Sequence, residues 1–102
     1  MTDTNKPLPA WLTLGADAAI VQLSRPVELN GVRVDRITLR SPTIGDMRAA
    51  NKLNKDDDEA KEIQLFATLA ECGVADIERL TLRDYGRLQE GYFRLVSDNV
   101  DA

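Results

Sequence analysis

The side chains that most often carry catalysis are scarce in this chain of 102 residues. It has no histidine, which removes the commonest general base and the commonest nitrogen ligand for zinc. Cys72 is the single cysteine, so it forms neither an internal disulfide nor a thiolate cluster, and no histidine can activate it as a nucleophile. Neither the dinucleotide-binding nor the P-loop glycine motif occurs. We therefore predict a protein that is not an enzyme and holds no metal or cofactor, although carboxylate catalysis stays open.

Two further patterns suggest a bound ion but are better explained by helix starts. The four consecutive acids at 56–59 lack the alternating ligands and the glycine of a calcium-binding EF-hand. Acids also stabilise a helix N-terminus, so we expect a loop that leads into a helix. The segment TIGDM at 43–47 could hold an anion on backbone N–H groups, but Asp46 in the first turn would repel it.

Residues 19–40 have the pattern of a β-hairpin. Asn30-Gly31 favours a type I′ turn, which pairs Leu29 with Val32 and gives the hairpin one apolar face. Along the second strand the apolar residues then change from even-numbered positions, Val32 and Val34, to odd-numbered ones, Ile37 and Leu39. We predict that one extra residue at Asp35-Arg36 forms a β-bulge there.

The same bulge would place Leu23 opposite Leu39 on the apolar side. Arg25 would still point inward beside Pro26, which cannot donate a ladder hydrogen bond. The first strand of the hairpin is therefore predicted to lie at the edge of the sheet.

Three helices are predicted after the hairpin, at about 44–53, 59–72 and 82–96, with a short helical turn or linker before the last. Thr43 with Asp46, and Thr81 with Asp84, have the spacing of capping pairs, and Gly73 is well placed to end the middle helix. The spacing of apolar residues predicts which side chains face inward. In the first helix these are Ile44, Met47 and Ala50, and in the last they are Tyr85, Leu88, Tyr92, Leu95 and Val96. Gly86 and Gly91 lie inside the last helix, where they indicate close packing against another helix or a flat surface for a partner's backbone; close packing is favoured.

The expected fold class is α+β, with an N-terminal β-hairpin followed by three to four α-helices. Residues 18–102 are predicted to form one domain, and residues 1–17, with two prolines, a flexible N-terminal arm. Trp11 and Leu12 in this arm either fold back onto the domain or dock a partner.

The charge is uneven along the chain. The net charge is −4, with +3 over residues 1–55 and −7 over residues 56–102. An acidic total argues against nucleic-acid binding, and the bipolar distribution permits a homo-oligomer without requiring one. The polar first residues and the lack of a long apolar run predict a cytoplasmic protein that does not enter a membrane.

The segment LSRPVELNGVRVDRITLRSPTIGDMRAANK at 23–52 resembles the tail assembly chaperones of contractile-tailed phages, the Mu-like and related group. The matching positions are Leu23, Pro26, Gly31, Ile37, Leu39, Arg40, Pro42, Thr43, Gly45 and Asp46. The segment IERLTLRDYGRLQEGYF at 77–93 adds Leu80, Asp84, Tyr85 and Leu88. The resemblance covers residues 20–96.

The resemblance implies a phage or prophage protein that binds the tape-measure protein and keeps it soluble while tail-tube subunits, which are further potential partners, assemble around it. Such chaperones act in the cytoplasm of the bacterial host and are absent from the finished virion. The group often makes a second, longer product by ribosomal frameshifting, and it has no catalytic residues. The candidate partner-binding residues are Trp11, Leu12, Tyr85, Tyr92 and Phe93. Phe93 is preferred because it lies one residue off the inward stripe of its helix.

Two other functions stay open at this point. A small DNA-binding regulator would use a basic face of Arg40, Arg48, Lys52 and Lys55. A minor structural tail protein would instead remain in the finished particle.

Overall fold

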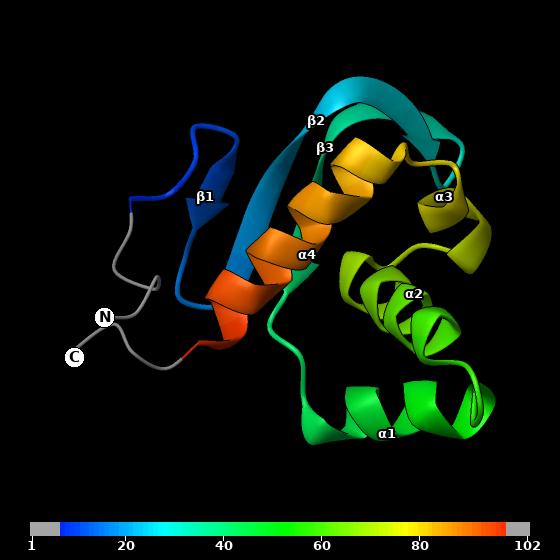
Figure 1. The fold of residues 1–102 in the computed structure, drawn as a ribbon. Helices are drawn as coiled ribbons and strands as arrows, with labels where there is room; N and C mark the ends of the chain where they lie inside the picture. The colour runs from blue at the N-terminus through cyan, green and yellow to red at the C-terminus, as the bar shows by residue number, and fades with distance from the viewer. Residues whose placement is uncertain (1–6, 98–102) are drawn as a thin grey trace.

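A computed structural model describes residues 7–97 (Figure 1). Over these residues the chain forms strands β1 (Leu12–Leu14), β2 (Ala18–Leu29) and β3 (Val32–Arg40). Helices α1 (Ile44–Leu53), α2 (Asp58–Ala70), α3 (Val74–Glu78) and α4 (Leu82–Val96) follow. The strands form an antiparallel sheet in the order β1-β2-β3. The predicted α+β fold, a hairpin followed by helices, is confirmed.

One face of the sheet is covered by helices. Helix α4 lies along β2 and also contacts β1, while α2 packs on β3 and α3 touches β2 (Figure 1). Helix α1 packs against α2, on the side away from the sheet (Figure 1). The buried apolar core lies between the sheet and these helices, and it comprises Leu12, Ala19, Val21, Leu23, Ile37, Leu39, Ala50, Leu65, Phe66, Ala67, Leu69, Ile77 and Leu88.

The tip of the hairpin has the predicted turn. Asn30 and Gly31 both have positive φ values, 54° and 80°, and Leu29 pairs with Val32, as expected for this turn type. The Asn30 side-chain amide donates to the carbonyl of Glu71 at 3.0 Å, and its backbone N–H donates to the carboxylate of Asp76 at 3.3 Å. These two bonds tie the hairpin tip to the end of α2, where Glu71 follows the helix, and to α3, which contains Asp76.

The predicted bulge is misplaced. The register shifts between Gln22 and Val27, so that residues 23–26 of β2 lie opposite Asp35 alone. The extra residues are therefore in β2, and Leu39 pairs with Ala19 rather than with Leu23. The cause lies in β2 itself, where Pro26 has no N–H to give to the ladder.

The predicted edge position of β2 is wrong, because β2 is the central strand. Residues 12–14 lie in the segment expected to be an arm, yet they form β1 and pair with β2. Leu12 pairs with Val21, and both side chains are buried. The part of the expected arm at 1–6 lies outside the described residues.

Helix α1 begins with the predicted cap. The Asp46 N–H donates to Thr43 Oγ1 at 3.1 Å, and the Thr43 N–H donates to Asp46 Oδ2 at 2.9 Å. Arg40 completes the group with two bonds to the same carboxylate, at 2.8 and 3.1 Å. This cap therefore joins the end of β3 to the start of α1.

The predicted end of α2 at Gly73 is wrong. Glu71 takes the left-handed conformation (φ 59°), and its N–H bonds to the carbonyls of Ala67 and Thr68. Gly73 has φ −88° and instead precedes α3, where its N–H donates to Asp76 Oδ2 at 3.2 Å. Because α3 begins soon after α2, the chain leaves the helical path at Glu71, two residues before the predicted Gly73.

Candidate partner-binding surface

The two predicted contact residues of the N-terminal segment pack against the domain. Leu12 is buried in β1, and Trp11 is half-buried beside the core. The guanidinium of Arg87 on α4 lies 5.1 Å from the centroid of the Trp11 ring, a cation–π contact, and donates to the carbonyl of Gln22 at 2.8 Å. The structure thus supports the alternative in which Trp11 folds back onto the domain.

Tyr85 and Tyr92 point inward, as predicted, and contact the buried ring of Phe66. Their ring centroids lie 5.7 and 5.5 Å from it. The Tyr85 hydroxyl donates to the carboxylate of Glu62 on α2. Burial, and then the Glu62 carboxylate, raise the pKa of Tyr85 above its ordinary value. These contacts fix α4 against α2, so the two tyrosines support the outer surface of α4 rather than form it.

Phe93 is 49% exposed, as its position one residue off the inward stripe predicted. Val96 was predicted to face inward but is 44% exposed, because it lies on the same side of α4 as Phe93. Of the five predicted contact residues, Phe93 is the one whose side chain the structure exposes. Its role in binding a partner stays a prediction.

Phe93 and Val96 belong to a longer row of residues along the outward side of α4. The row consists of Leu82, Gly86, Gln89, Phe93 and Val96, and we call it the outer row. Its members are alternately four and three residues apart, the spacing that keeps side chains on one narrow face of a helix. Leu82 is 88% exposed, the largest exposed fraction among the described large apolar residues.

The two glycines of α4 have opposite surroundings. A Cβ added at Gly91 would lie 2.9 Å from Val21 Cγ2, so Gly91 lets α4 approach the sheet. A Cβ added at Gly86, within the outer row, would have no described atom within 4 Å. Close packing against a helix, the favoured explanation for both glycines, is therefore wrong: Gly91 packs on a strand, and Gly86 faces open space.

The outer row has an acidic edge on the side of α2. Gln89 donates to the Glu62 carboxylate at 2.8 Å, so this carboxylate lies directly beside the row. Glu59, one turn earlier in α2 and exposed, also raises the pKa of Tyr85. On the other side of the row, Glu90 pairs with Arg94 at 2.8 Å.

Helix α1 exposes most of its apolar side chains. Ile44 and Met47 were predicted to face inward, yet they are 73% and 48% exposed, and Leu53 is also exposed. Ala50 is the buried residue of this helix. The cause is the position of α1. It packs mainly against α2, with few contacts to other elements, and therefore buries one narrow stripe of side chains.

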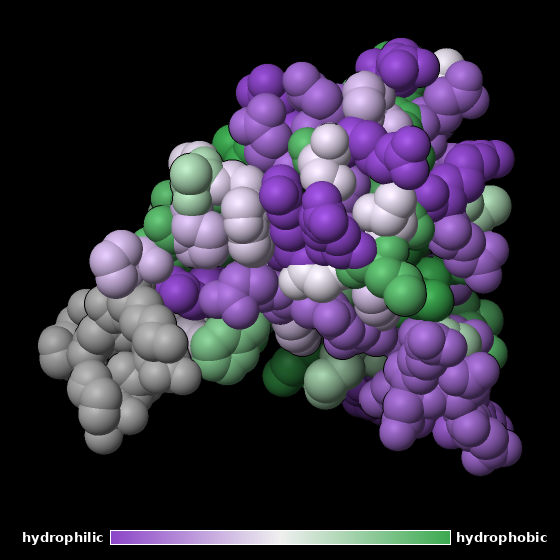
Figure 2. Space-filling model, turned by 45° about the horizontal axis from the view of Figure 1, so that its top comes forward, coloured by the Kyte–Doolittle hydropathy of each residue, from purple (hydrophilic) through white to green (hydrophobic). Residues whose placement is uncertain are grey.

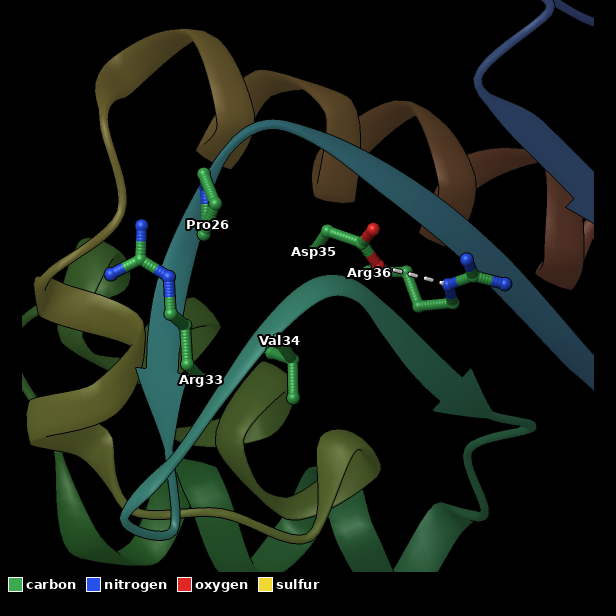
Figure 3. Close-up of a pocket in the computed structure, with 5 residues that line it drawn as sticks. All are labelled: Pro26, Arg33, Val34, Asp35 and Arg36. Atoms are coloured by element: carbon green, nitrogen blue, oxygen red, sulfur yellow. Dashed lines mark hydrogen bonds and ion pairs between the residues drawn. The ribbon is translucent and has the colours of Figure 1, made fainter.

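Several hollows in the described surface are lined largely by charged and polar side chains. One hollow, beside the β2 bulge, is lined by Pro26, Arg33, Val34, Asp35 and Arg36. Its two arginines point away from each other, and Asp35 pairs with Arg36 at 3.2 Å (Figure 3). A small-molecule site usually has apolar walls and a few convergent polar groups, which this hollow lacks. Figure 2 likewise shows hydrophobic side chains in separate patches among hydrophilic ones.

The basic face considered for DNA binding is divided in the structure. Arg48, Lys52 and Lys55 line one hollow on α1, but Arg40 is bonded to Asp46 instead. Within residues 7–97, no three side chains of the metal-binding types lie close enough together to hold an ion. No helix in the same range is long and apolar enough to cross a membrane.

Comparison with known proteins identifies the family of the chain. The family described as "Phage tail assembly chaperone proteins, E, or 41 or 14" matches residues 21–97, most of the chain. The chain belongs to the phage tail assembly chaperones. No curated protein and no solved structure matches it.

The matched range contains the whole of α4 and therefore the whole outer row of this phage tail assembly chaperone. The sequence predicted Phe93 as a contact and offered a surface for a partner's backbone at Gly86 as the less favoured alternative. Leu82, Gln89 and Val96 were not predicted to lie on this surface. The alternating spacing of four and three residues from Leu82 to Val96 was the available signal. It was overlooked because a second apolar stripe, through Leu88 and Tyr92, runs along the same helix and forms the core.

Proposed function

We propose that this chaperone binds the tape-measure protein and keeps it soluble while the tail tube assembles around it. The observation that carries the proposal is the family match over residues 21–97. The chaperone acts without catalysis in the cytoplasm of the bacterial host, and it leaves before the virion is finished. Tail-tube subunits are further candidate partners.

The surface of the chain is compatible with this role. A chaperone for amphipathic helices needs accessible apolar side chains beside charges that keep the complex soluble. Phe93 and Val96 provide the first on α4, and the neighbouring acids of α2 provide the second. Of the five residues expected from the sequence to contact the partner, we propose Phe93 as the main one.

Co-expression tests the proposal. The tape-measure protein encoded with this chaperone is produced alone and together with it, and its soluble fraction is measured by sedimentation and gel analysis. We expect the tape-measure protein to be largely insoluble alone and to co-purify with the chaperone. An equally insoluble tape-measure protein in both cultures would contradict the proposal. So would finding the chaperone as a stoichiometric component of purified virions, which would make it a structural tail protein.

A further inference from the structure

We infer that the outer row of α4 is the docking surface for a single helix of the partner. That helix carries apolar residues at alternating spacings of four and three, and basic residues along the edge that lies against α2. The inference rests on the proposed function, because it specifies the segment by which the tape-measure protein would be held.

The length and spacing of the row suit a helix that packs along α4. From Leu82 to Val96 it spans the whole of α4, about 21 Å at 1.5 Å per residue. Apolar positions that alternate at four and three residues form the seam by which one helix packs along another. In this protein the buried side of α4 already contacts the sheet and α2 through Leu88, Tyr85 and Tyr92. The row, which is apolar at Leu82, Phe93 and Val96, is therefore a second seam, of which the fold of this chain engages Gln89 through its bond to Glu62.

Gly86 leaves a gap in the outer row. It lies between Leu82 and Phe93 in the row, and no described atom lies within 4 Å of the position a Cβ would take. Such a gap can receive a large side chain from a facing helix, as in the knobs-into-holes packing of coiled coils. Gly91 shows that α4 uses glycine for close approach elsewhere, since it faces Val21. Gly86 has no such neighbour within the described chain, so an external helix is the fitting occupant.

The charges beside the outer row favour a basic partner. The α2 edge of the row carries Glu62, bonded to Gln89, and the exposed Glu59. Charged residues that flank an apolar seam select partners of opposite charge. A partner helix with lysine or arginine on this edge is therefore favoured over an acidic one. An antiparallel pair with a second copy of the chain is disfavoured, because it would bring the two acidic edges together.

Binding of synthetic peptides tests the inference without relying on the tape-measure protein. Three peptides of three heptads each are compared by fluorescence anisotropy with the full chain. The first has leucine at the alternating positions and lysine along one edge of the helix. The second has glutamate in place of lysine, and the third has the first peptide's composition in shuffled order. We expect the first peptide to bind at least about tenfold more tightly than the other two.

Matched variants locate the binding surface. Gly86→Gln adds a neutral, helix-favouring side chain to open space, so it should fold at least as stably as the original while its affinity falls about tenfold or more. Leu53→Ser, which removes an exposed apolar side chain from α1, should leave affinity unchanged. Glu59→Gln should weaken binding of the lysine peptide, whereas Glu28→Gln, the same charge change on the hairpin, should not.

Three results would overturn the inference. They are equal binding of the lysine and glutamate peptides, an unchanged affinity in Gly86→Gln, and a dimer of the chain that this variant dissociates, which would make a second copy the occupant. Failure of the inference is distinct from failure of the proposed function. A chaperone that solubilises the tape-measure protein but binds no peptide refutes the inference alone. Binding of the lysine peptide at the row without any effect on the tape-measure protein refutes the proposed function alone.

Discussion

The carboxylate of Asp84, in the first turn of α4, accepts a hydrogen bond at 2.8 Å from the backbone N–H of Ser24 in the bulge of β2. Sixty positions separate the two residues in the sequence, and Asp84 is almost completely buried. The bulge removes Ser24 from the β2–β3 ladder, and Asp84 supplies the acceptor that the neighbouring strand would otherwise give. The start of α4, and with it the outer row, is thereby fixed to the central strand.

Replacing Asp84 tests this connection. Asp84→Ala leaves the Ser24 N–H without its acceptor, so we expect the free energy of unfolding to fall by about 2 kcal/mol. Asp84→Asn keeps an oxygen acceptor for the Ser24 N–H, while its NH2 group takes the place of Oδ2, which has no hydrogen-bond partner among the described residues, so it should cost less than Asp84→Ala. Urea unfolding followed by circular dichroism measures both. Equal stability of the alanine variant and the original chain would show that the bond contributes nothing.

The two glycines of α4 should respond to alanine in opposite directions. At Gly91 the new Cβ would overlap the buried, stiff side chain of Val21 at 2.9 Å. The overpacking costs about 2 kcal/mol and exceeds the gain of about 1 kcal/mol in helix propensity, so Gly91→Ala should be destabilised by about 1 kcal/mol. Gly86→Ala meets no neighbour and should be stabilised by about 1 kcal/mol. Thermal unfolding compares the pair, and a shift of both variants in the same direction would contradict the packing described.

Local features of the fold could be predicted from the sequence, because nearby residues determine them. Asn30-Gly31 specified its turn by conformational preference, and Thr43 with Asp46 specified the start of α1 by spacing alone. The bulge of β2 could not be located, because Ser24 finds its acceptor in a helix far along the chain. The parity of apolar residues showed that an irregularity was needed but gave no indication of which strand contained it.

The cap of α1 should depend on pH. Hydrogen bonds from Arg40, and then from the backbone of Thr43, hold the pKa of Asp46 well below its ordinary value of 3.8. A lowered folded-state pKa means that the contribution of Asp46 to stability is complete well above pH 3.8 and is lost as the pH falls through 3.8 towards the folded-state pKa. Amide hydrogen exchange in α1 should therefore accelerate between about pH 5 and about pH 2 relative to α4 once the intrinsic pH dependence is removed.

A variant isolates the part played by Asp46. In Asp46→Asn, which does not titrate, this extra acceleration in α1 should disappear while α1 is less protected at neutral pH. The same acid response in the variant and the original chain would assign the effect to other groups.

The Cys72 thiol should react slowly with disulfide reagents in the folded chain. Burial, and then the charge of Asp76, raise the pKa of Cys72 to about 11. Because the thiolate is the reacting form, modification by a disulfide reagent at about pH 8 should be on the order of a hundredfold slower in the native protein than in urea. A native rate close to that of the unfolded chain would show that the loop around Cys72 opens readily.

The candidate surface was less predictable than the fold. Helical periodicity correctly separated Phe93 from the inward tyrosines, because it measures the direction of a side chain around one helix. It could not show that Ile44 and Met47 are exposed, since that depends on α1 resting on α2 and not on the sheet.

Site-specific crosslinking tests the central claim most directly. A photoreactive phenylalanine analogue is placed at position 93 of the outer row, and in a matched chain at position 53 of α1, and each chaperone is produced in cells that assemble tails. Irradiation at position 93 is expected to join the chaperone to the tape-measure protein, identified by mass spectrometry, while position 53 gives little or no such product. Absence of the product from position 93, or equal yields from both positions, would contradict the assignment of α4 as the surface that holds the tape-measure protein.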